Sequence, residues 1–373
     1  MKKKILFISD FSFHIPGGAQ KSMEVIMEGL CDNYDFYVLM PGSTYKPESE
    51  KYKCICLEEF DDFLVNDSVL KSLKIIKAIR RVIKQLSPDI IHAHMLSGMA
   101  VLEILKVFRM IKGKVVYTER GVADQYSKIN RFLIRKAVKN FDGIVVTTNY
   151  NQKLYSRLYN AIPEKTRVIP NTAGSLFEEY NPMMKRDEKQ RIGFTKKVVM
   201  FNARLSYAKN WEMSLDVIKW INQEYDYQFI VVVGTDRSEK ENSESKKMLE
   251  EIQECVGSEN LCSYVNMDLS DLSRLYYAAD VFIMTSRSES FGRTAVEAMS
   301  RSVVVFGTKI DGLSEVIGFD DYKFTDLDDF KEKFRLFESR GACAEQARFL
   351  ERFRKNYTLE TNLTLYDDLY KSL

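Results

Sequence analysis

The stretch Ser288-Glu289-Ser290-Phe291-Gly292-Arg293-Thr294-Ala295-Val296-Glu297-Ala298-Met299 follows the apolar run 280–284 and decides the fold. The run indicates a buried parallel strand, and an Ala/Met-rich helix pattern begins just after Gly292. Such a strand–loop–helix unit points backbone N–H groups and a positive dipole end at whatever lies above the sheet. Glu289 in the loop and Glu297 in the helix can each accept hydrogen bonds from hydroxyls. Phosphate at the helix end with carboxylates on either side suits a nucleotide-activated sugar.

The rest of the chain repeats this alternation of short β-rich runs and helix-like stretches. Strands buried on both faces of a parallel sheet form continuous Val/Ile runs, and each half of the chain contains five such runs. The candidates are 5–8, 36–39, 90–93, 115–118 and 143–146, then 198–201, 229–233, 263–265, 281–284 and 303–306. They predict an α/β protein with two doubly wound, Rossmann-like parallel-sheet domains facing a cleft, with ligands at the carboxyl ends of the strands.

The domain boundary is expected between residues 171 and 186, where Asn, Pro, Gly and charged residues interrupt the pattern. A chain of 373 residues is long for one domain, so we predict an N-terminal domain of residues 1–180 and a C-terminal domain of residues 181–373. The amphipathic tail after Ala344 predicts helix, and the terminal helix is expected to pack back on the N-terminal domain.

Charge is unevenly distributed along the chain. Residues 1–180 contain 27 Lys/Arg against 20 Asp/Glu, whereas the remainder contains 28 against 33. A basic first half suggests an anionic partner for that domain. A pI near 8.0 and the lack of an aromatic–basic module argue against nucleic acid.

The six cysteines are scattered, and Cys54-x-Cys56 has no second cysteine pair or nearby histidine, so a zinc site is not expected. The apolar start 5–8 is too short for a signal peptide, and no apolar run approaches the roughly 20 residues of a membrane span. A reducing cytoplasm therefore fits best.

Three further loops follow strand candidates. The first runs from Asp10 to Gln20 and contains Gly17-Gly18, where backbone can approach a phosphate or sugar closely. In the second, Arg204 and Lys209 lie five residues apart and together suit a diphosphate. In the third, Gly234 ends a strand and leaves room for a base. Ordinary loop glycines and solvated surface cations are the alternative interpretations.

Taken together, these loops resemble the retaining nucleotide-sugar glycosyltransferases of family 4 (group 1), which have the two-domain GT-B fold. Glu-x-Phe-Gly-x4-Glu-Ala is the specific signature, and the resemblance covers nearly the whole chain. The segments that carry it are Gly17-Gly18-Ala19-Gln20, Pro88-Asp89-Ile90-Ile91-His92-Ala93-His94, Ala203-Arg204-Leu205 with Lys209, Val233-Gly234, Ala279-Asp280-Val281 and the stretch from Glu289 to Glu297.

The resemblance implies a glycosyltransferase of hexosyltransferase type, with the acceptor in the N-terminal domain and a UDP- or GDP-linked sugar in the C-terminal domain. In the family, the residue at Glu289 contacts donor-sugar hydroxyls and the one at Glu297 holds the ribose. Protein cations and the helix end carry the leaving-group charge, so no metal or other cofactor is expected. The implied donor-binding residues are Gly17, Gly18, Arg204, Lys209, Gly234, Ser290, Phe291, Gly292, Arg293, Thr294 and Glu297.

The catalytic residues implied are Glu289, Lys209 and Arg204, but the base is open. Many relatives have a histidine after the fourth strand, where this chain has Arg120, and arginine does not act as a base at neutral pH. The substitutes are Glu119, His14 and Asp10. In a retaining transfer the departing phosphate helps to deprotonate the acceptor, which lowers the demand for a protein base.

The remaining polar candidates have competing interpretations. His92 lies within a strand run and is expected to be a hydrogen-bonded core residue. His94 at the strand end faces the cleft and, with Arg120, is assigned to the acceptor side. Asp326-Leu327-Asp328 precedes a helix pattern and is expected to cap it instead of binding metal.

Residues 70–86 carry six cations and no acid, with an apolar helical stripe. One interpretation is a helix that covers its sheet with a solvated basic edge. The other is a face that docks on an anionic membrane, which suits a lipid-linked saccharide acceptor in surface polysaccharide or glycan biosynthesis. We therefore expect a cytoplasmic protein, peripheral at the inner face of the membrane.

Two other functions use the same residues. One is a nucleotide-sugar epimerase of the same fold, which would need further acid/base groups. The other is a catalytically silent partner subunit, suggested by Arg120, although the intact donor set argues against it. A nicotinamide oxidoreductase is disfavoured because the first loop lacks the G-x-G-x-x-G fingerprint.

Overall fold

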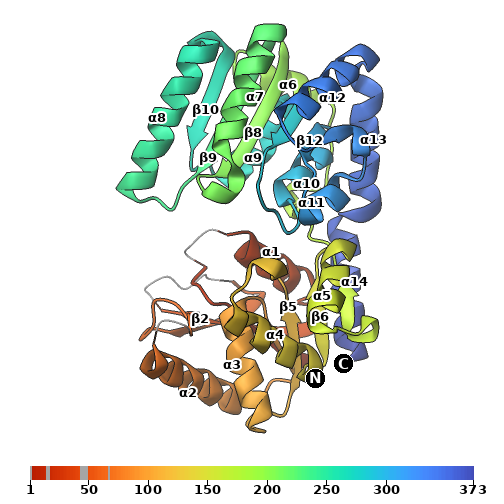
Figure 1. The fold of residues 1–373 in the computed structure, drawn as a ribbon. Helices are drawn as coiled ribbons and strands as arrows, with labels where there is room; N and C mark the ends of the chain where they lie inside the picture. The colour runs from red at the N-terminus through yellow and green to blue at the C-terminus, as the bar shows by residue number, and fades with distance from the viewer. Residues whose placement is uncertain (1, 14–16, 43–48, 66–67) are drawn as a thin grey trace. The chain divides into compact units, whose positions relative to one another are not determined.

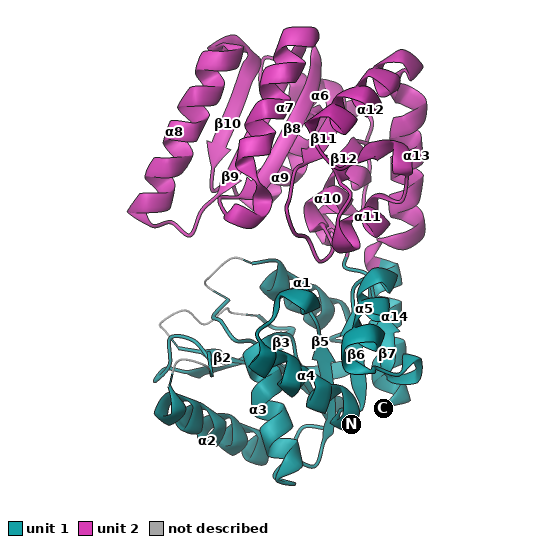
Figure 2. Ribbon diagram, in the orientation of Figure 1, with its two compact units in different colours: residues 1–171, 360–373 teal, residues 172–359 magenta. Residues whose placement is uncertain are grey.

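The computed structural model describes residues 2–13, 17–42, 49–65 and 68–373. The chain divides into two compact units (Figure 2), one of residues 1–171 and 360–373 and the other of residues 172–359. The sequence predicts the division after residue 180. It falls earlier because Ala173 and Phe177 are buried in the hydrophobic core of the second unit. Residues 360–373 belong to the first unit, where Tyr370 is fully buried.

The first unit is built on a seven-stranded parallel sheet of order β3-β2-β1-β4-β5-β6-β7. The two edge strands escape the sequence prediction because they are half-exposed and lack a continuous apolar run. The strands are β1 (Lys3–Ile8), β2 (Tyr34–Pro41), β3 (Tyr52–Leu57), β4 (Ile90–Ala93), β5 (Lys114–Thr118), β6 (Gly143–Val146) and β7 (Thr166–Val168).

Helices cover both faces of this sheet (Figure 1). Leu6 and Ile8 of β1 join the core beneath α2, α3, α4 and α5, whereas Ile5 and Phe7 join the core beneath α1 and α14. This alternation follows from the two-residue period of a strand. The elements are α1 (Gly18–Gly29), α2 (Val69–Leu86), α3 (Leu96–Val107), η1 (Ala123–Gln125), α4 (Lys128–Asn140), α5 (Asn149–Tyr159), η2 (Pro163–Lys165) and α14 (Leu359–Ser372).

The second unit contains a six-stranded parallel sheet of order β10-β9-β8-β11-β12-β13. Its strands lie in one large core that both flanking helix layers share. The two-residue strand β13 is too short to give a periodic signal in the sequence. The strands are β8 (Lys197–Arg204), β9 (Tyr227–Gly234), β10 (Leu261–Val265), β11 (Val281–Met284), β12 (Val304–Thr308) and β13 (Lys323–Phe324).

Helix α12 (Leu327–Arg340) begins where the sequence predicts a capped helix. Asp326 caps α12, because its side chain accepts hydrogen bonds from the amides of Asp328 and Asp329 at 3.1 and 3.0 Å, which confirms the capping prediction. The elements are η3 (Ser175–Phe177), α6 (Met183–Arg191), η4 (Tyr207–Lys209), α7 (Trp211–Glu224), α8 (Glu239–Val256), η5 (Ser258–Asn260), α9 (Leu269–Leu275), η6 (Tyr276–Ala278), α10 (Arg293–Ser300), α11 (Asp311–Ile317), η7 (Asp320–Tyr322), α12 (Leu327–Arg340) and α13 (Ala342–Asn356). No helix in the described part of the chain is long and apolar enough to cross a lipid bilayer.

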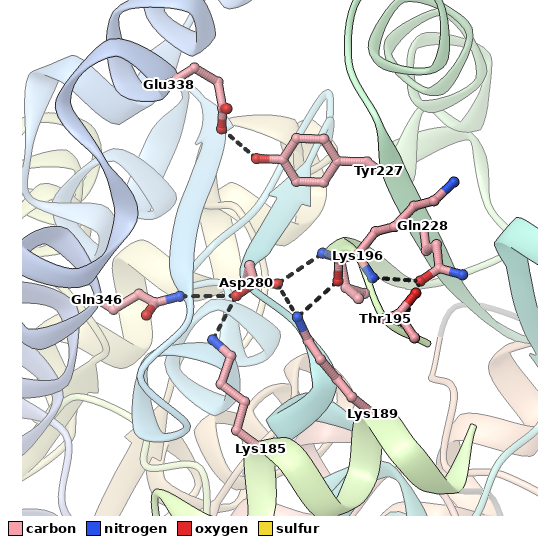
Figure 3. A network of polar contacts seen from close by, with 10 residues as sticks. Lys185, Lys189, Thr195, Lys196, Tyr227, Gln228, Asp280, Glu338 and Gln346 are labelled. Atoms are coloured by element: carbon pink, nitrogen blue, oxygen red, sulfur yellow. Dashed lines mark hydrogen bonds and ion pairs between the residues drawn. The ribbon is translucent and has the colours of Figure 1, made fainter. Parts of the chain in front are cut away.

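Asp280, directly before β11, ties the start of this strand to its surroundings (Figure 3). Its carboxylate pairs with Lys185 and Lys189 of α6, both at 2.7 Å, and accepts a hydrogen bond from the amide of Val198 at 2.9 Å. Gln346 of α13 donates a longer bond of 3.4 Å. Burial would raise the pKa of Asp280, but the two lysines outweigh it, so that the pKa lies below its ordinary value.

In both sheets the strand order reverses beside the first strand of the unit. β1 has β2 on one side and β4 on the other, and β8 has β9 and β11. Open α/β sheets bind their ligands outside the carboxyl ends of the strands at such a switch point. The loops after β8 and β11 therefore define the candidate site of the second unit, and those after β1 and β4 define that of the first.

Candidate functional site

The loop after β8 brings two cations to the switch point of the second unit. Arg204 is the last residue of β8, and its backbone oxygen accepts a hydrogen bond from Trp211 Nε1 at 3.0 Å. Its side chain lies against Gly234, where a Cβ would come within 3.4 Å of it. Lys209 ends η4, and the left-handed Asn210 then turns the chain into α7. The predicted pair therefore stands at one sheet edge on a loop with internal hydrogen bonds.

The loop after β11 places Glu289 against this cation pair. Oε2 of Glu289 forms an ion pair with Lys209, and Oε1 accepts a hydrogen bond from the amide of Gly292 at 3.1 Å. The amide of Glu289 itself donates to Asp311 Oδ2, 3.3 Å away. The structure thus brings Lys209 and Glu289 into direct contact, with one carboxylate oxygen on the lysine and the other on the amide of Gly292.

Helix α10 begins directly behind this carboxylate. Gly292 precedes it with φ +91°, and a Cβ there would lie 2.6 Å from Leu313 Cδ1, so the turn requires glycine. Gly292 at the N-cap has no side chain to bond the first amides of α10, which leaves the positive dipole end of the helix available to an anion. Ser290 and Phe291 before it are buried, and Thr294 in its first turn is half-buried.

Glu297, one turn into α10, is almost fully enclosed. Its Oε2 accepts a hydrogen bond from the hydroxyl of Tyr276 at 3.2 Å, and its Oε1 lies 3.4 Å from Nε of Arg293. Burial raises the pKa of Glu297, and Arg293 followed by Tyr276 opposes the rise. Both predicted carboxylates therefore lie within the same loop–helix unit, each beside a cation.

The third predicted loop, after β9, is fixed by two hydrogen bonds between Thr235 and Asn266. Gly234 ends β9, and Thr235 follows it. The hydroxyl of Thr235 accepts a hydrogen bond from Asn266 Nδ2 at 2.7 Å, and its amide donates one to Asn266 Oδ1 at 2.8 Å. Asn266 has φ +57°, a left-handed conformation that asparagine tolerates better than other non-glycine residues. Asparagine can therefore occupy this turn, where most side chains would be strained.

In the first unit the loop after β1 leads to Gly17 and Gly18. Gly18 opens α1 with open space around the position of a Cβ, whereas a Cβ at Gly17 would lie 2.4 Å from Gln20 Oε1. His14, one of the proposed bases, lies outside the described residues.

Asp10 and Glu119, the other two proposed bases, are both buried and hydrogen-bonded. Asp10 accepts hydrogen bonds from the amides of Ser97 and Gly98 at 2.8 and 2.7 Å. Burial raises the pKa of Asp10 to about 7. Glu119 accepts bonds from the amide of Gly121 and the hydroxyl of Tyr126, both at 2.7 Å, and from the hydroxyl of a buried tyrosine of α5. This geometry favours roles in holding loops over proton transfer to a bound acceptor.

His92 and His94 stack at the end of β4, with ring centroids 4.0 Å apart. His92 bonds to Tyr370 at 2.9 Å and to Thr118 at 2.7 Å, which confirms the prediction of a satisfied core residue. Burial, and to a smaller degree the charge of Arg120, lowers the pKa of His92 well below its ordinary value.

His94 is fully buried beside Arg120, whose Nη2 lies 3.0 Å from Nδ1 of the histidine. Because arginine only donates, Nδ1 accepts and the proton of the neutral ring is on Nε2. Burial, His92 and Arg120 lower the pKa of His94 well below its ordinary value. Within the described part of the chain, His94 Nε2 and Arg120 Nε are buried donors without a hydrogen-bond partner. The two residues assigned to the acceptor side therefore lie together, but His94 is enclosed at the strand end, whereas the sequence predicts that it faces the cleft.

Sequence reasoning missed two residues of the second site, Tyr276 and Asp311. Asp311 opens α11 after β12, at the same sheet edge as Glu289, so strand-end reasoning applied to the loop after β12 would have found it. Tyr276 lies in a short 3-10 turn, and nothing in its surroundings in the sequence points to Glu297.

Comparison with known proteins agrees with this geometry. Residues 184–356 match the model of the glycosyl transferases group 1, and residues 16–173 match that of glycosyltransferase family 4. A relative from Klebsiella pneumoniae, an uncharacterised 41.2 kDa protein in the cps region, is 24% identical over 95% of this chain and 98% of its own.

Two solved structures match the whole chain. Sucrose-phosphate synthase from Thermosynechococcus elongatus has a TM-score of 0.82 at 16% identity, covering 100% of this chain and 99% of that chain. Anabaena HepE in complex with UDP and glucose has a TM-score of 0.77 at 17% identity, with 100% of both chains covered. The chain thus has the GT-B fold of two parallel-sheet α/β domains, and it belongs to the group 1 glycosyltransferases of family 4 as a transferase enzyme.

Proposed function

We propose that this enzyme transfers a sugar from a UDP- or GDP-linked donor to a saccharide acceptor, with retention at the anomeric carbon and without a metal ion. One observation carries the proposal: the contact between Lys209 and Glu289 at the switch point, next to the uncapped end of α10. A cation for a diphosphate and a carboxylate for sugar hydroxyls stand side by side there. HepE, whose solved structure contains UDP and glucose, supports a donor of this class.

The charge of the leaving group is the main demand of this reaction. The bond from the anomeric carbon to the phosphate oxygen breaks, and the bond to the acceptor oxygen forms on the same face of the sugar. The acceptor proton passes to the departing phosphate. Arg204, Lys209 and the end of α10 would stabilise the diphosphate as its charge develops, which is the role a metal plays elsewhere. The enclosed positions of Asp10 and Glu119 support a mechanism that asks little of a protein base.

The acceptor belongs to the first unit in this proposal. The buried donors of His94 and Arg120 suit an oxygen-rich, anionic group, and the positive balance of residues 1–180 favours the same charge. A lipid-linked saccharide, whose diphosphate lies at the membrane surface, combines these properties. The cps-region relative from Klebsiella supports a place in surface polysaccharide biosynthesis.

Helix α2 supports contact with the inner face of a membrane. Leu70 and Leu73 at its start are exposed, at 74% and 49%, next to a series of exposed cations. Lys71 is neutralised by Asp62 at 2.7 Å, whereas Lys74 and Lys77 form no ion pair among the described residues. Anionic lipid attracts such a face by about 1 kcal/mol per cation near the surface. The enzyme would then be cytoplasmic and peripheral.

The test is an assay of the purified chain with a panel of UDP- and GDP-sugars, with and without membrane extract, in EDTA and in added Mg²⁺. We expect one donor to give a lipid-extractable product, and only when the membrane extract is present. The yield should be the same in EDTA and in Mg²⁺. NMR of the product should show the same anomeric configuration as in the donor. Inversion, loss of transfer in EDTA, or conversion of the donor to an epimer would each contradict the proposal.

A further inference from the structure

Arg293 opens helix α10 directly after the loop glycine, and only 15% of its side chain is exposed. Its Nη2 donates a hydrogen bond to the backbone oxygen of Ala173, 3.0 Å away, and its Nε lies 3.4 Å from Oε1 of Glu297. Within the second unit, the described contacts of the guanidinium are therefore one hydrogen bond through Nη2 and one ion pair through Nε, which makes no hydrogen bond to Glu297. Its side chain does not extend into solvent above the helix end.

Arginine is a poor choice at this position for the helix itself. A cation near a helix N-terminus opposes the dipole, and a cation four residues before a glutamate is the weaker orientation of such a pair. Helix stability thus does not account for Arg293. Its two contacts with Ala173 and Glu297 do.

Glu297 depends on these neighbours for its charge. Tyr276, which donates to Oε2, accepts in turn from Asn202 Nδ2 at 2.9 Å, so the tyrosine proton points at the carboxylate. Arg293 on the same helix and Tyr276 from η6 are the charged and titratable groups of the described chain that act on Glu297. An ionised carboxylate has about four acceptor positions, so that about two remain for ligand hydroxyls. A protonated carboxyl would lose that capacity.

We propose that Arg293 is a positioning residue for the donor, which holds Glu297 ionised and oriented to accept the two ribose hydroxyls. This inference rests on the proposed function, because it takes a ribonucleotide as the ligand of Glu297. It assigns the side chain of Arg293 to the ribose, whereas the family resemblance implies only that Arg293 is one of the donor-binding residues.

The test compares binding of UDP and GDP with binding of their 2′-deoxy forms by calorimetry at pH 6 and pH 8. Arg293→Met removes the charge at similar length, and we expect it to weaken binding of the better ribonucleotide about tenfold at pH 8 and further at pH 6. The deoxy form should weaken by less than about threefold, because it lacks one of the hydroxyls that Glu297 holds. Arg293→Lys should bind within about threefold of the wild type.

Arg340→Met is the matched control. Arg340 of α12 forms an ion pair with Asp321, 2.7 Å away, in the same unit. It should leave binding unchanged, and thermal unfolding establishes that every variant is folded. Equal weakening of the ribo and deoxy forms by Arg293→Met at both pH values, or no weakening at all, would overturn the role of Arg293. A wild-type chain that binds none of the four nucleotides would overturn the proposed function itself.

Discussion

Lys209 and Glu289, 80 residues apart in the chain, form an ion pair between the loops that follow β8 and β11. Each residue is the natural partner of a different part of a nucleotide sugar. The cation suits the diphosphate, and the carboxylate suits the sugar hydroxyls. The two charges neutralise each other in this pair, so a donor that contacts both residues would divide the pair between its two ends.

This relationship predicts that the two halves of the pair can be separated by substitution. Glu289→Gln releases Lys209, and we expect UDP or GDP binding to stay within about threefold of the wild type while kcat/KM for transfer falls at least about 100-fold. Lys209→Met removes the phosphate contact, and we expect nucleotide binding and transfer to weaken together, by about 10- to 100-fold for binding. Calorimetry and initial rates measure the two quantities.

Lys219→Met is the control for this experiment, because Lys219 forms a Lys–Glu pair with Glu251 at 2.8 Å elsewhere in the second unit. It should change neither quantity. Nucleotide binding that falls equally in Glu289→Gln and Lys209→Met would show that the two side chains do not contact different parts of the donor.

Asp280 gives a prediction on stability. Asp280→Ala leaves Lys185, Lys189 and the amide of Val198 without their shared acceptor, and removing one partner of a buried pair costs about 3–5 kcal/mol. Asp280→Asn keeps one acceptor oxygen and should cost less. Guanidinium unfolding followed by tryptophan fluorescence is the measurement, since Trp211 and Trp220 both lie in the second unit.

The exposed pair of Asp321 and Arg340, 2.7 Å apart, supplies the comparison. Asp321→Ala should change the free energy of unfolding by less than about 1 kcal/mol, because surface pairs contribute little. Similar losses in Asp321→Ala and Asp280→Ala would mean that the Asp280 cluster does not stabilise the unit.

The sequence predicts the interior of the fold better than its edges, for a physical reason. A strand such as β11 is buried on both faces, so every position has to be apolar and the run is visible. The edge strand β3 exposes Lys53 and only half-buries the four residues from Cys54 to Leu57, so the pattern that marks a buried strand is lost. Its place is decided by parallel pairing with β2, which no local sequence feature encodes.

The same distinction applies to the candidate sites. Arg204, Lys209 and Glu289 could be grouped in advance, because the carboxyl ends of parallel strands meet at one edge. The contact of Arg293 with Ala173 could not, because a backbone oxygen 120 residues away has no side-chain signature. Likewise, Glu119 follows a strand as a catalytic group would, and only the packed structure shows that its donors come from a turn and from tyrosines of separate elements.

Unit 1 should lose stability in mild acid. His92 and His94 have folded pKa values well below 6.5. Their contribution to the free energy of unfolding is therefore present above pH 6.5 and is lost as the pH falls towards the folded pKa. Each histidine lowers the free energy of unfolding by up to about 1.4 kcal/mol per pH unit. Asp10 acts in the opposite sense. Its pKa is raised from 3.8 to about 7, so its contribution is full below 3.8 and is lost as pH rises to 7. With two groups against one, the net change between pH 6.5 and 5 is a loss.

His94→Gln tests this balance, since the amide oxygen still accepts a bond from Arg120 while one titration is removed. We expect the free energy of unfolding of the first unit, followed by far-UV circular dichroism, to depend less on pH than in the wild type. The difference in slope should be up to about 1.4 kcal/mol per pH unit. Tryptophan fluorescence of the second unit is the internal control. An unchanged pH dependence in His94→Gln would show that this histidine is not held neutral by the fold.

Membrane association through α2 gives the last prediction. Replacing Lys74, Lys77 and Lys84 with glutamine removes three exposed cations and leaves the buried face of the helix unchanged. At about 1 kcal/mol per cation, partitioning to vesicles of phosphatidylcholine with phosphatidylglycerol should fall about 100-fold. Replacing Lys240, Lys246 and Lys247 of α8 with glutamine makes the same change in net charge on the second unit, and it should have little effect.

Wild-type binding should also weaken between 0.05 and 0.5 M salt, since exposed charges are screened over about 10 Å at 0.1 M. Equal partitioning to neutral and anionic vesicles, or equal losses in both triple variants, would mean that α2 does not dock on the membrane and that its cations form only the solvated edge of a helix covering its sheet.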